Sequence, residues 1–190
     1  AFRIPNLLRR FVAEGAMSVA FIPVFTETLE TRGRDETLRT ARILMTVMGL
    51  GLAALTLFGI VFAPAWVRWF APGFAGETGK LALTTGLTRI LLPYVFLVSL
   101  VALAGGLLNS LRHFATPAIS PIMLNLAMIA AILFLCPHLA SPIHGLAYAV
   151  IAGGVLQLVV QLPALVRRGM RLSPLWEPNH PAVKRSLGLL

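Results

Sequence analysis

The stretch ILMTVMGLGLAALTLFGIVFAPAWV, residues 43–67, runs for 25 residues without a single charge. About 20 consecutive apolar residues are enough for a helix to cross the hydrocarbon core of a bilayer. Similar uncharged runs follow at residues 90–111, 118–135 and 143–166. The sequence therefore predicts an all-α, polytopic membrane helical bundle.

The composition supports this class and argues against others. Of the 190 residues, 57% are hydrophobic and only 12% are charged, whereas a soluble domain carries roughly 25% charged residues. The net charge of +9 does not indicate nucleic-acid binding, because the basic residues separate apolar runs and do not form a basic face with exposed aromatic residues. The single cysteine, Cys136, allows no internal disulfide and no thiolate metal site.

No arrangement of residues indicates an enzyme. The chain contains no Walker loop, no HExxH motif and no recognisable Ser/His/Asp set. The histidines lack the spacing of metal ligands, so we expect neither a metal nor another cofactor.

Five complete transmembrane helices and the start of a sixth are expected, at approximately residues 5–28, 40–70, 80–111, 117–136 and 142–168. A cytoplasmic linker and the beginning of the next helix would occupy residues 169–190. The chain begins without Met and ends without a polar tail, so we interpret residues 1–190 as one transmembrane segment of a larger protein.

The distribution of Lys and Arg predicts the orientation. Four lie in the connection Glu27–Arg42, two in Ala63–Lys80, one beside His113, none in Cys136–His144, and five after the last full span. Cytoplasmic connections carry an excess of basic residues. The first, third and fifth connections, with ten basic residues against two, are therefore predicted to be cytoplasmic.

The first predicted helix, in AFRIPNLLRRFVAEGAMSVAFIPVF (residues 1–25), carries charges that an apolar helix would normally lack. Charged side chains at membrane depth are tolerated mainly where they face a protein interior or a watery cavity. Arg9 and Asn6 lie on one helical face, and Arg10 lies next to them, which suggests a path for an anion. Two other interpretations remain: an Arg10–Glu14 ion pair that only fixes packing, and an Arg3 side chain that reaches the outer headgroups.

Several uncharged positions indicate helix packing. Small residues that let helices approach closely occur at Gly49/Gly51, Gly105/Gly106 and Gly153/Gly154. Gln157 and Gln161 share one helical face and are expected to hold helices together. Arg89 could extend the cavity or reach the headgroup region.

Four segments resemble the MurJ (MviN) family of bacterial lipid II flippases, part of the multidrug/oligosaccharidyl-lipid/polysaccharide exporter superfamily. They are FRIPNLLRRFVAEGAMSVAFIPVF (2–25), APGF (71–74), LLPYVFLVSLVALAGGLLNSLRHFATPAISPIMLN (91–125) and GGVLQLVVQLP (153–163). The likeness covers essentially the whole chain, which would correspond to the second through sixth helices of the N-terminal half and the start of the seventh.

The resemblance implies a function in cell wall biogenesis. Family members move lipid II, the lipid-linked peptidoglycan precursor, from the inner to the outer leaflet of the bacterial cytoplasmic membrane. They do so by alternating access around a cationic cavity between two helical bundles. By position in NLLRR, Arg9 matches a cavity-lining arginine; Arg3 matches a basic position, and Glu14 a candidate gating acid. The implied partners are lipid II, membrane lipids and the remaining helices of the transporter.

Two alternatives stay open at the level of sequence. A related exporter could carry another cargo, as a polysaccharide-lipid flippase or a drug/cation antiporter does. A non-transporting membrane scaffold would need none of these charges for transport. The segment FVAEGAMS also departs slightly from the family, which often has an aromatic residue or Gln nearby.

Overall fold

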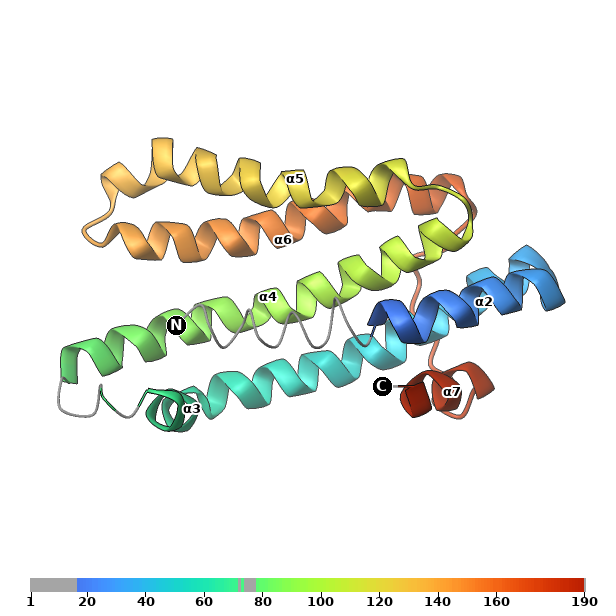
Figure 1. Cartoon of the computed structure of the whole chain (residues 1–190), viewed down its shortest axis with the longest axis horizontal. Helices are drawn as coiled ribbons and strands as arrows, with labels where there is room; N and C mark the ends of the chain where they lie inside the picture. Colours follow the sequence, from blue (N-terminus) through green and yellow to red (C-terminus); the bar gives the residue numbers. More distant parts are fainter. Residues whose placement is uncertain (1–16, 72, 74–77, 190) are drawn as a thin grey trace.

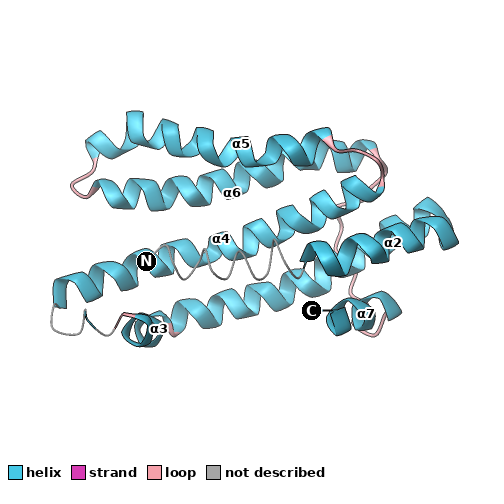
Figure 2. Ribbon diagram, viewed as in Figure 1, coloured by secondary structure: helices cyan, strands magenta, loops and turns pink. Residues whose placement is uncertain are grey.

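The structure, a computed structural model, describes residues 17–71, 73 and 78–189. The described residues form helices joined by loops, and no strand occurs among them (Figure 2). The main helices are α2 (Met17–Val61), α3 (Ala63–Phe70), α4 (Thr78–Ser110), α5 (Ala115–Ala130), α6 (Pro142–Arg167) and α7 (Pro181–Leu189). The all-helical class is confirmed for this part of the chain.

Four helical stretches of the described residues are long and apolar enough to cross a membrane. They are Phe21–Val61, Gly79–Ser110, Ala115–His138 and Pro142–Arg167. The third combines α5 with a π-helical turn, Ala131–Leu135, and a 3-10 turn, Cys136–His138. The part of the first expected helix before residue 17 lies outside the described residues, so five complete spans remain an expectation.

Helix α2 consists of two arms that meet at Gly33. The backbone of Gly33 leaves the helical region, with φ 81° and ψ −177°, a conformation open essentially to glycine alone. The chain folds back there, so that Phe21 and Phe25 of the first arm share a core with Leu44 of the second arm (Figure 1). The polar connection expected at 27–42 is thus helical on both sides of one sharp turn.

The long helix expected at 40–70 is interrupted near its end. Helix α2 stops at Val61, and the short helix α3 follows after Phe62. Pro64, at the start of α3, lacks the amide that would continue the α2 ladder to the carbonyl of Ile60. Figure 1 shows α3 almost end-on while α2 and α4 run across the view, so the proline marks a real change of direction.

Helix α4 is the central element of the bundle. It packs against α2 on one side and α6 on the other, and α5 covers α6 (Figure 1). The most apolar window of α4 is 61% buried inside the protein, against 11% for the window that contains α5. The side chains of α5 therefore mostly face outward, as expected for a lipid-facing helix.

The two ends of the bundle differ in charge. The turn at Gly33, the α4–α5 turn and the end of α6 lie together at the right of Figure 1. The short helix α3, the start of α4 and the α5–α6 loop lie at the left. The connections rich in Lys and Arg therefore meet at one end, as the alternation in the sequence requires.

Candidate functional site

The residues expected to line the cavity are Arg3, Asn6, Arg9, Arg10 and Glu14. All five lie outside the described residues, which begin at Met17. Their proposed roles as cavity-lining and gating residues therefore stay predictions. The structure describes instead how the first arm of α2, from Met17 onward, is held and what surrounds its end near Gly33.

The first arm of α2 is fixed by a large apolar core. Phe21, Val24 and Phe25 are buried together with side chains from the second arm of α2, from α4 and from the α6–α7 region. Phe25 is fully buried, and its ring stacks on Phe21 with centroids 6.4 Å apart. Close packing in a protein interior permits little rotation or sliding, so the first arm of α2 is firmly seated.

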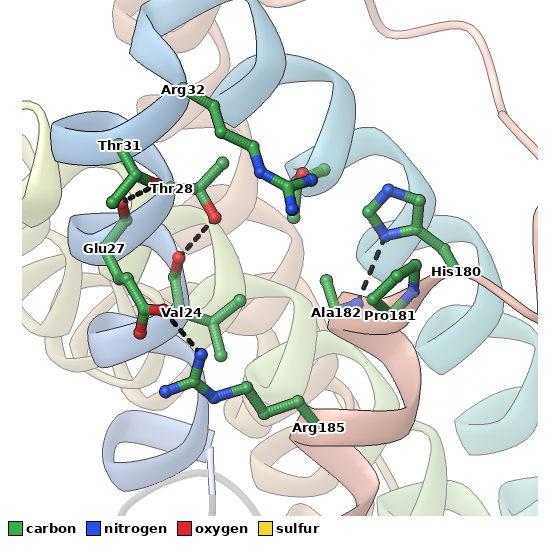
Figure 3. A pocket seen from close by; sticks show the side chains of 10 residues that line it. Val24, Glu27, Thr28, Thr31, Arg32, His180, Pro181, Ala182 and Arg185 are labelled. Atoms are coloured by element: carbon green, nitrogen blue, oxygen red, sulfur yellow. Dashed lines mark hydrogen bonds and ion pairs between the residues drawn. The ribbon is translucent and has the colours of Figure 1, made fainter.

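A small polar pocket lies where this arm meets α7 (Figure 3). Its volume is about 130 Å³. It is lined by Val24, Glu27, Thr28, Thr31, Arg32, Thr40, His180, Pro181, Ala182 and Arg185. The hydroxyls of Thr28 and Thr31 donate to carbonyls four residues earlier in their own helix, at 2.7 Å each. The hydroxyls of these threonines therefore already have partners, and the charged side chains of the pocket are Glu27, Arg32 and Arg185.

The main contact across the pocket is an ion pair between α2 and α7. Nη1 of Arg185 donates to Oε1 of Glu27 at 2.7 Å (Figure 3). This hydrogen bond with the Glu27 carboxylate is the main reason that the pKa of Arg185 lies above its ordinary value. Because both side chains are about half exposed, solvent and salt screen the pair, and it serves to position α7.

Arginines of α2 hold the segment between α6 and α7. Nη2 of Arg34 donates to the carbonyl of Arg168 at 2.8 Å. Arg39 pairs with Glu177 at 2.9 Å, and Arg42 binds both the carbonyl and the hydroxyl of Ser173. These contacts tie residues 168–177 across the basic end of the bundle; we call this segment the strap.

A polar cluster lies inside the bundle, between α5 and α6. The hydroxyl of Ser120 donates to the carbonyl of Gln157 at 3.4 Å, and Nε2 of Gln161 donates to Ser120 Oγ at 3.3 Å. All three residues are at least 95% buried. The Gln161 side chain therefore links α6 to α5 as expected, whereas Gln157 takes part only through its backbone carbonyl. The side-chain oxygens of both glutamines lack a partner within the described part of the chain.

Arg89 has a local role at the junction of α2 and α3. Its Nε donates to the carbonyl of Ile60 at 3.3 Å, the same carbonyl that Pro64 cannot reach. This contact ties α4 to the end of α2. It gives Arg89 a partner that neither of the two sequence interpretations foresaw.

Metal ligation finds no support in the described residues, where no three His, Cys, Asp or Glu side chains come together. His113 contacts the hydroxyl of Thr116, and Nδ1 of His180 accepts from the amide of Ala182. Each of these histidines thus has a local hydrogen-bonding partner.

Sequence reasoning missed the contacts that α2 makes with the strap and with α7. Glu27 and Arg185 are 158 positions apart, and no local pattern predicts which acid meets which base over such a distance. The one usable signal was the orientation predicted from the Lys and Arg counts, which places residues 27–42 and the region after 167 on the same, cytoplasmic side. Opposite charges in two connections on one side were candidates for pairing.

Comparison with known proteins assigns the family. The family model described as "Lipid II flippase MurJ" matches residues 1–190. A lipid II flippase MurJ from Burkholderia cenocepacia is 45% identical over 98% of this chain. Proteins described as probable lipid II flippases MurJ from Buchnera aphidicola and Rhizobium tropici are 42% and 38% identical over 92% and 98% of it.

The match covers only part of these relatives. The chain spans 37%, 34% and 36% of the length of the three proteins. Within that span, the match takes in the whole chain, including residues 1–16 and the basic connections described above. The resemblance seen in the sequence is thus confirmed, and the chain belongs to the lipid II flippase MurJ family.

Proposed function

We propose that this chain forms part of the N-terminal helical bundle of a transporter that flips lipid II from the inner to the outer leaflet of the bacterial inner membrane. The observation that carries the proposal is the family match over residues 1–190, with 45% identity to a lipid II flippase MurJ. In the complete transporter this segment contributes five transmembrane helices and the start of a sixth. A second bundle forms the other wall of the cavity.

The chemistry of the first helix fits this cargo. Lipid II carries a pyrophosphate, and the planar guanidinium of arginine matches phosphate oxygens in a site of low dielectric constant. Arg9 would bind the headgroup, with Asn6, Arg10 and Arg3 along the path and Glu14 as a gating partner. The lipid tails can remain in the bilayer, so the cavity has to lower the barrier for the headgroup alone.

The described helices supply a suitable support for such a site. The arm of α2 that follows Arg9 is buried on its neighbours through Phe21 and Phe25. A firmly held helix keeps a cavity arginine in place while bundles move relative to each other. The movement between inward- and outward-open states should then change the contacts between the two bundles and leave the interior of this bundle unchanged.

Complementation tests both the activity and the role of Arg9. A bacterium is depleted of its own lipid II flippase and supplied with the full-length transporter that carries this sequence, as wild type, Arg9→Ala and Arg171→Ala. Arg171 is exposed at the basic end of the bundle and provides a matched loss of charge. We expect growth with wild type and Arg171→Ala, and lysis with Arg9→Ala at equal membrane abundance.

The remaining outcomes separate the alternatives. Growth with Arg9→Ala would retain the flippase and reduce Arg9 to a structural residue. Failure of a well-expressed wild type would favour an exporter of another cargo, such as a polysaccharide-linked lipid. A scaffold without transport activity predicts that Arg9→Ala alters assembly alone, which blue-native electrophoresis of the same membranes would detect.

A further inference from the structure

A second pocket at the basic end of the bundle is lined by three arginines. It has a volume of about 200 Å³ and lies among Leu29, Arg34, Ser110, Leu111, Arg112 and Arg168. The three arginines come from the turn in α2, the α4–α5 turn and the end of α6. No acidic residue lines it, in contrast to the pocket beside α7, which contains Glu27.

The hydrogen bonds within this pocket leave its positive charge uncompensated. Arg34 donates to the carbonyl of Arg168, and Arg168 donates to the carbonyl of Ala164. Carbonyls at the end of a helix carry only partial negative charge. The side chain of Arg112 has no hydrogen bond or ion pair among the residues that the structure describes. Three like charges around one hollow repel one another, and a bound anion would relieve that repulsion.

The backbone of Arg112 provides a second, independent observation. Helices α4 and α6 end in the same motif, in which the amide after the left-handed residue bonds back five positions, from His113 to Leu108 and from Met170 to Leu165. At the left-handed position α6 has Gly169, with φ 86°, and α4 has Arg112, with φ 57°. Glycine is the favoured residue there because any side chain is disfavoured.

Arg112, which has this disfavoured backbone conformation, is therefore also one of the three arginines that line the pocket. Strained backbone conformations concentrate at functional sites, where the side chain has a use that offsets the local cost. Arg112 is the only residue other than glycine with a positive φ in the described part of the chain. A capping role alone does not require arginine, since Gly169 closes the equivalent turn without a side chain.

We propose that Arg34, Arg112 and Arg168 form a binding site for a phosphate group at the cytoplasmic end of the bundle. Arginine suits this ligand because its planar donors match phosphate oxygens in pairs. The phosphate comes from the headgroup of an anionic phospholipid of the inner leaflet or from a soluble phosphate. The bound group joins the ends of α2, α4 and α6, separately from the transport cavity that begins with Arg9.

The test uses the full-length transporter in a neutral detergent and follows thermal unfolding. The probes are dihexanoyl phosphatidylglycerol, inorganic phosphate and, as a zwitterionic control, dihexanoyl phosphatidylcholine. The variants are Arg112→Gly, Arg34→Gln and Arg171→Gln; Arg171 is an exposed arginine at the same end that does not line the pocket.

We expect phosphatidylglycerol to raise the Tm of the wild type by a few degrees, on the order expected for a ligand that binds only the folded state. Arg171→Gln should retain this rise, and Arg112→Gly and Arg34→Gln should lose most of it. Without ligand, Arg112→Gly should unfold at the same or a higher temperature, because glycine relieves the backbone strain. Loss of binding together with retained stability excludes misfolding as the cause.

Each outcome decides the proposal. An equal rise with inorganic phosphate supports the site and identifies a soluble anion as its ligand; a rise with phosphatidylglycerol alone identifies the lipid. The site is refuted if neither phosphate ligand stabilises the wild type. It is equally refuted if phosphatidylcholine acts as strongly as phosphatidylglycerol, or if Arg112→Gly and Arg34→Gln respond as the wild type does.

Discussion

Pro64 and Arg89 act on one backbone group. Pro64 lacks the amide that would bond to the carbonyl of Ile60, and the Arg89 side chain donates to that carbonyl from the neighbouring helix α4. The positive charge of Arg89 also suits the end of α2, where the helix dipole is negative.

Arg89→Ala should therefore lower the free energy of unfolding by about 0.5–1.5 kcal/mol, because it removes a hydrogen bond to the carbonyl of Ile60. In a Pro64→Ala background the new amide can itself donate to Ile60, so the same substitution should have a smaller effect. Unfolding of the four proteins in detergent measures this coupling. Equal losses in the two backgrounds would show that Arg89 does not act through this carbonyl.

At the scale of helix pairs, the glycines singled out in the sequence are not equivalent. A Cβ added at Gly153 would lie 2.6 Å from a methyl group of Leu124 and 3.0 Å from its Cα. A Cβ at Gly51 would meet nothing within 4 Å. A side-chain methyl group can move aside, whereas a backbone atom moves only with its helix. Gly153 thus sets the distance between α5 and α6, and Gly51 makes no such close contact with the described residues.

Gly153→Ala should lower the free energy of unfolding by about 1–3 kcal/mol, the usual range for overpacking. Gly51→Ala, on a helix of the same bundle, should be neutral or stabilising by up to about 1 kcal/mol, because alanine favours helix more than glycine does. Parallel denaturation curves in detergent test the pair. A neutral Gly153→Ala would mean that α5 and α6 can separate freely.

The strap is held mainly by side chains, so its docking should depend on single residues. Arg42→Ala removes two hydrogen bonds to Ser173. Arg32→Ala removes a nearby exposed arginine that makes no hydrogen bond or ion pair with the described residues. Arg42→Ala should speed chymotrypsin cleavage after Leu175 or Trp176 roughly 2- to 10-fold, as expected for weak, partly screened contacts. The Arg32→Ala variant should be cleaved at the wild-type rate. Equal cleavage rates in the two variants would indicate that the strap is docked by its apolar residues.

At the scale of the whole molecule, hydropathy was sufficient to predict the all-helical class and the four apolar helices of the described residues. Uncharged runs predicted the helical class, and the NLLRR block pointed to the family that the comparisons confirm. The family is one of transporters and not of enzymes, and its membership confirms the assignment to the bacterial inner membrane. The roles of Arg9 and its neighbours stay predictions, because those residues lie outside the described part.

Breaks and pairings were harder to predict for physical reasons. The run 43–67 remains apolar through Pro64, so hydropathy gives no sign that the helix ends at Val61. The polar residues 27–42 suggested a non-helical connection. A helix, however, tolerates polar residues wherever they face water, and within this segment only Gly33 departs from helical backbone angles. Contacts such as Arg39–Glu177 depend on how distant connections meet, which local sequence does not encode.

The charge difference between the two ends makes a prediction about the whole molecule. The structure places the turn at Gly33, the α4–α5 turn and the end of α6 at one end, and α3 and the α5–α6 loop at the other (Figure 1). Basic connections remain in the cytoplasm, so the end with α3 should face outward.

In the full-length transporter with Cys136→Ala, Gly73→Cys and His138→Cys should react with a membrane-impermeant maleimide in right-side-out vesicles. Arg171→Cys should react only after the vesicles are opened, because its connection is predicted to be cytoplasmic. The two outer positions lie in different connections, so their agreement tests the orientation of the bundle as a unit. Labelling of Arg171→Cys alone in sealed vesicles would show the opposite orientation, and the arginine pocket would then face the outer leaflet.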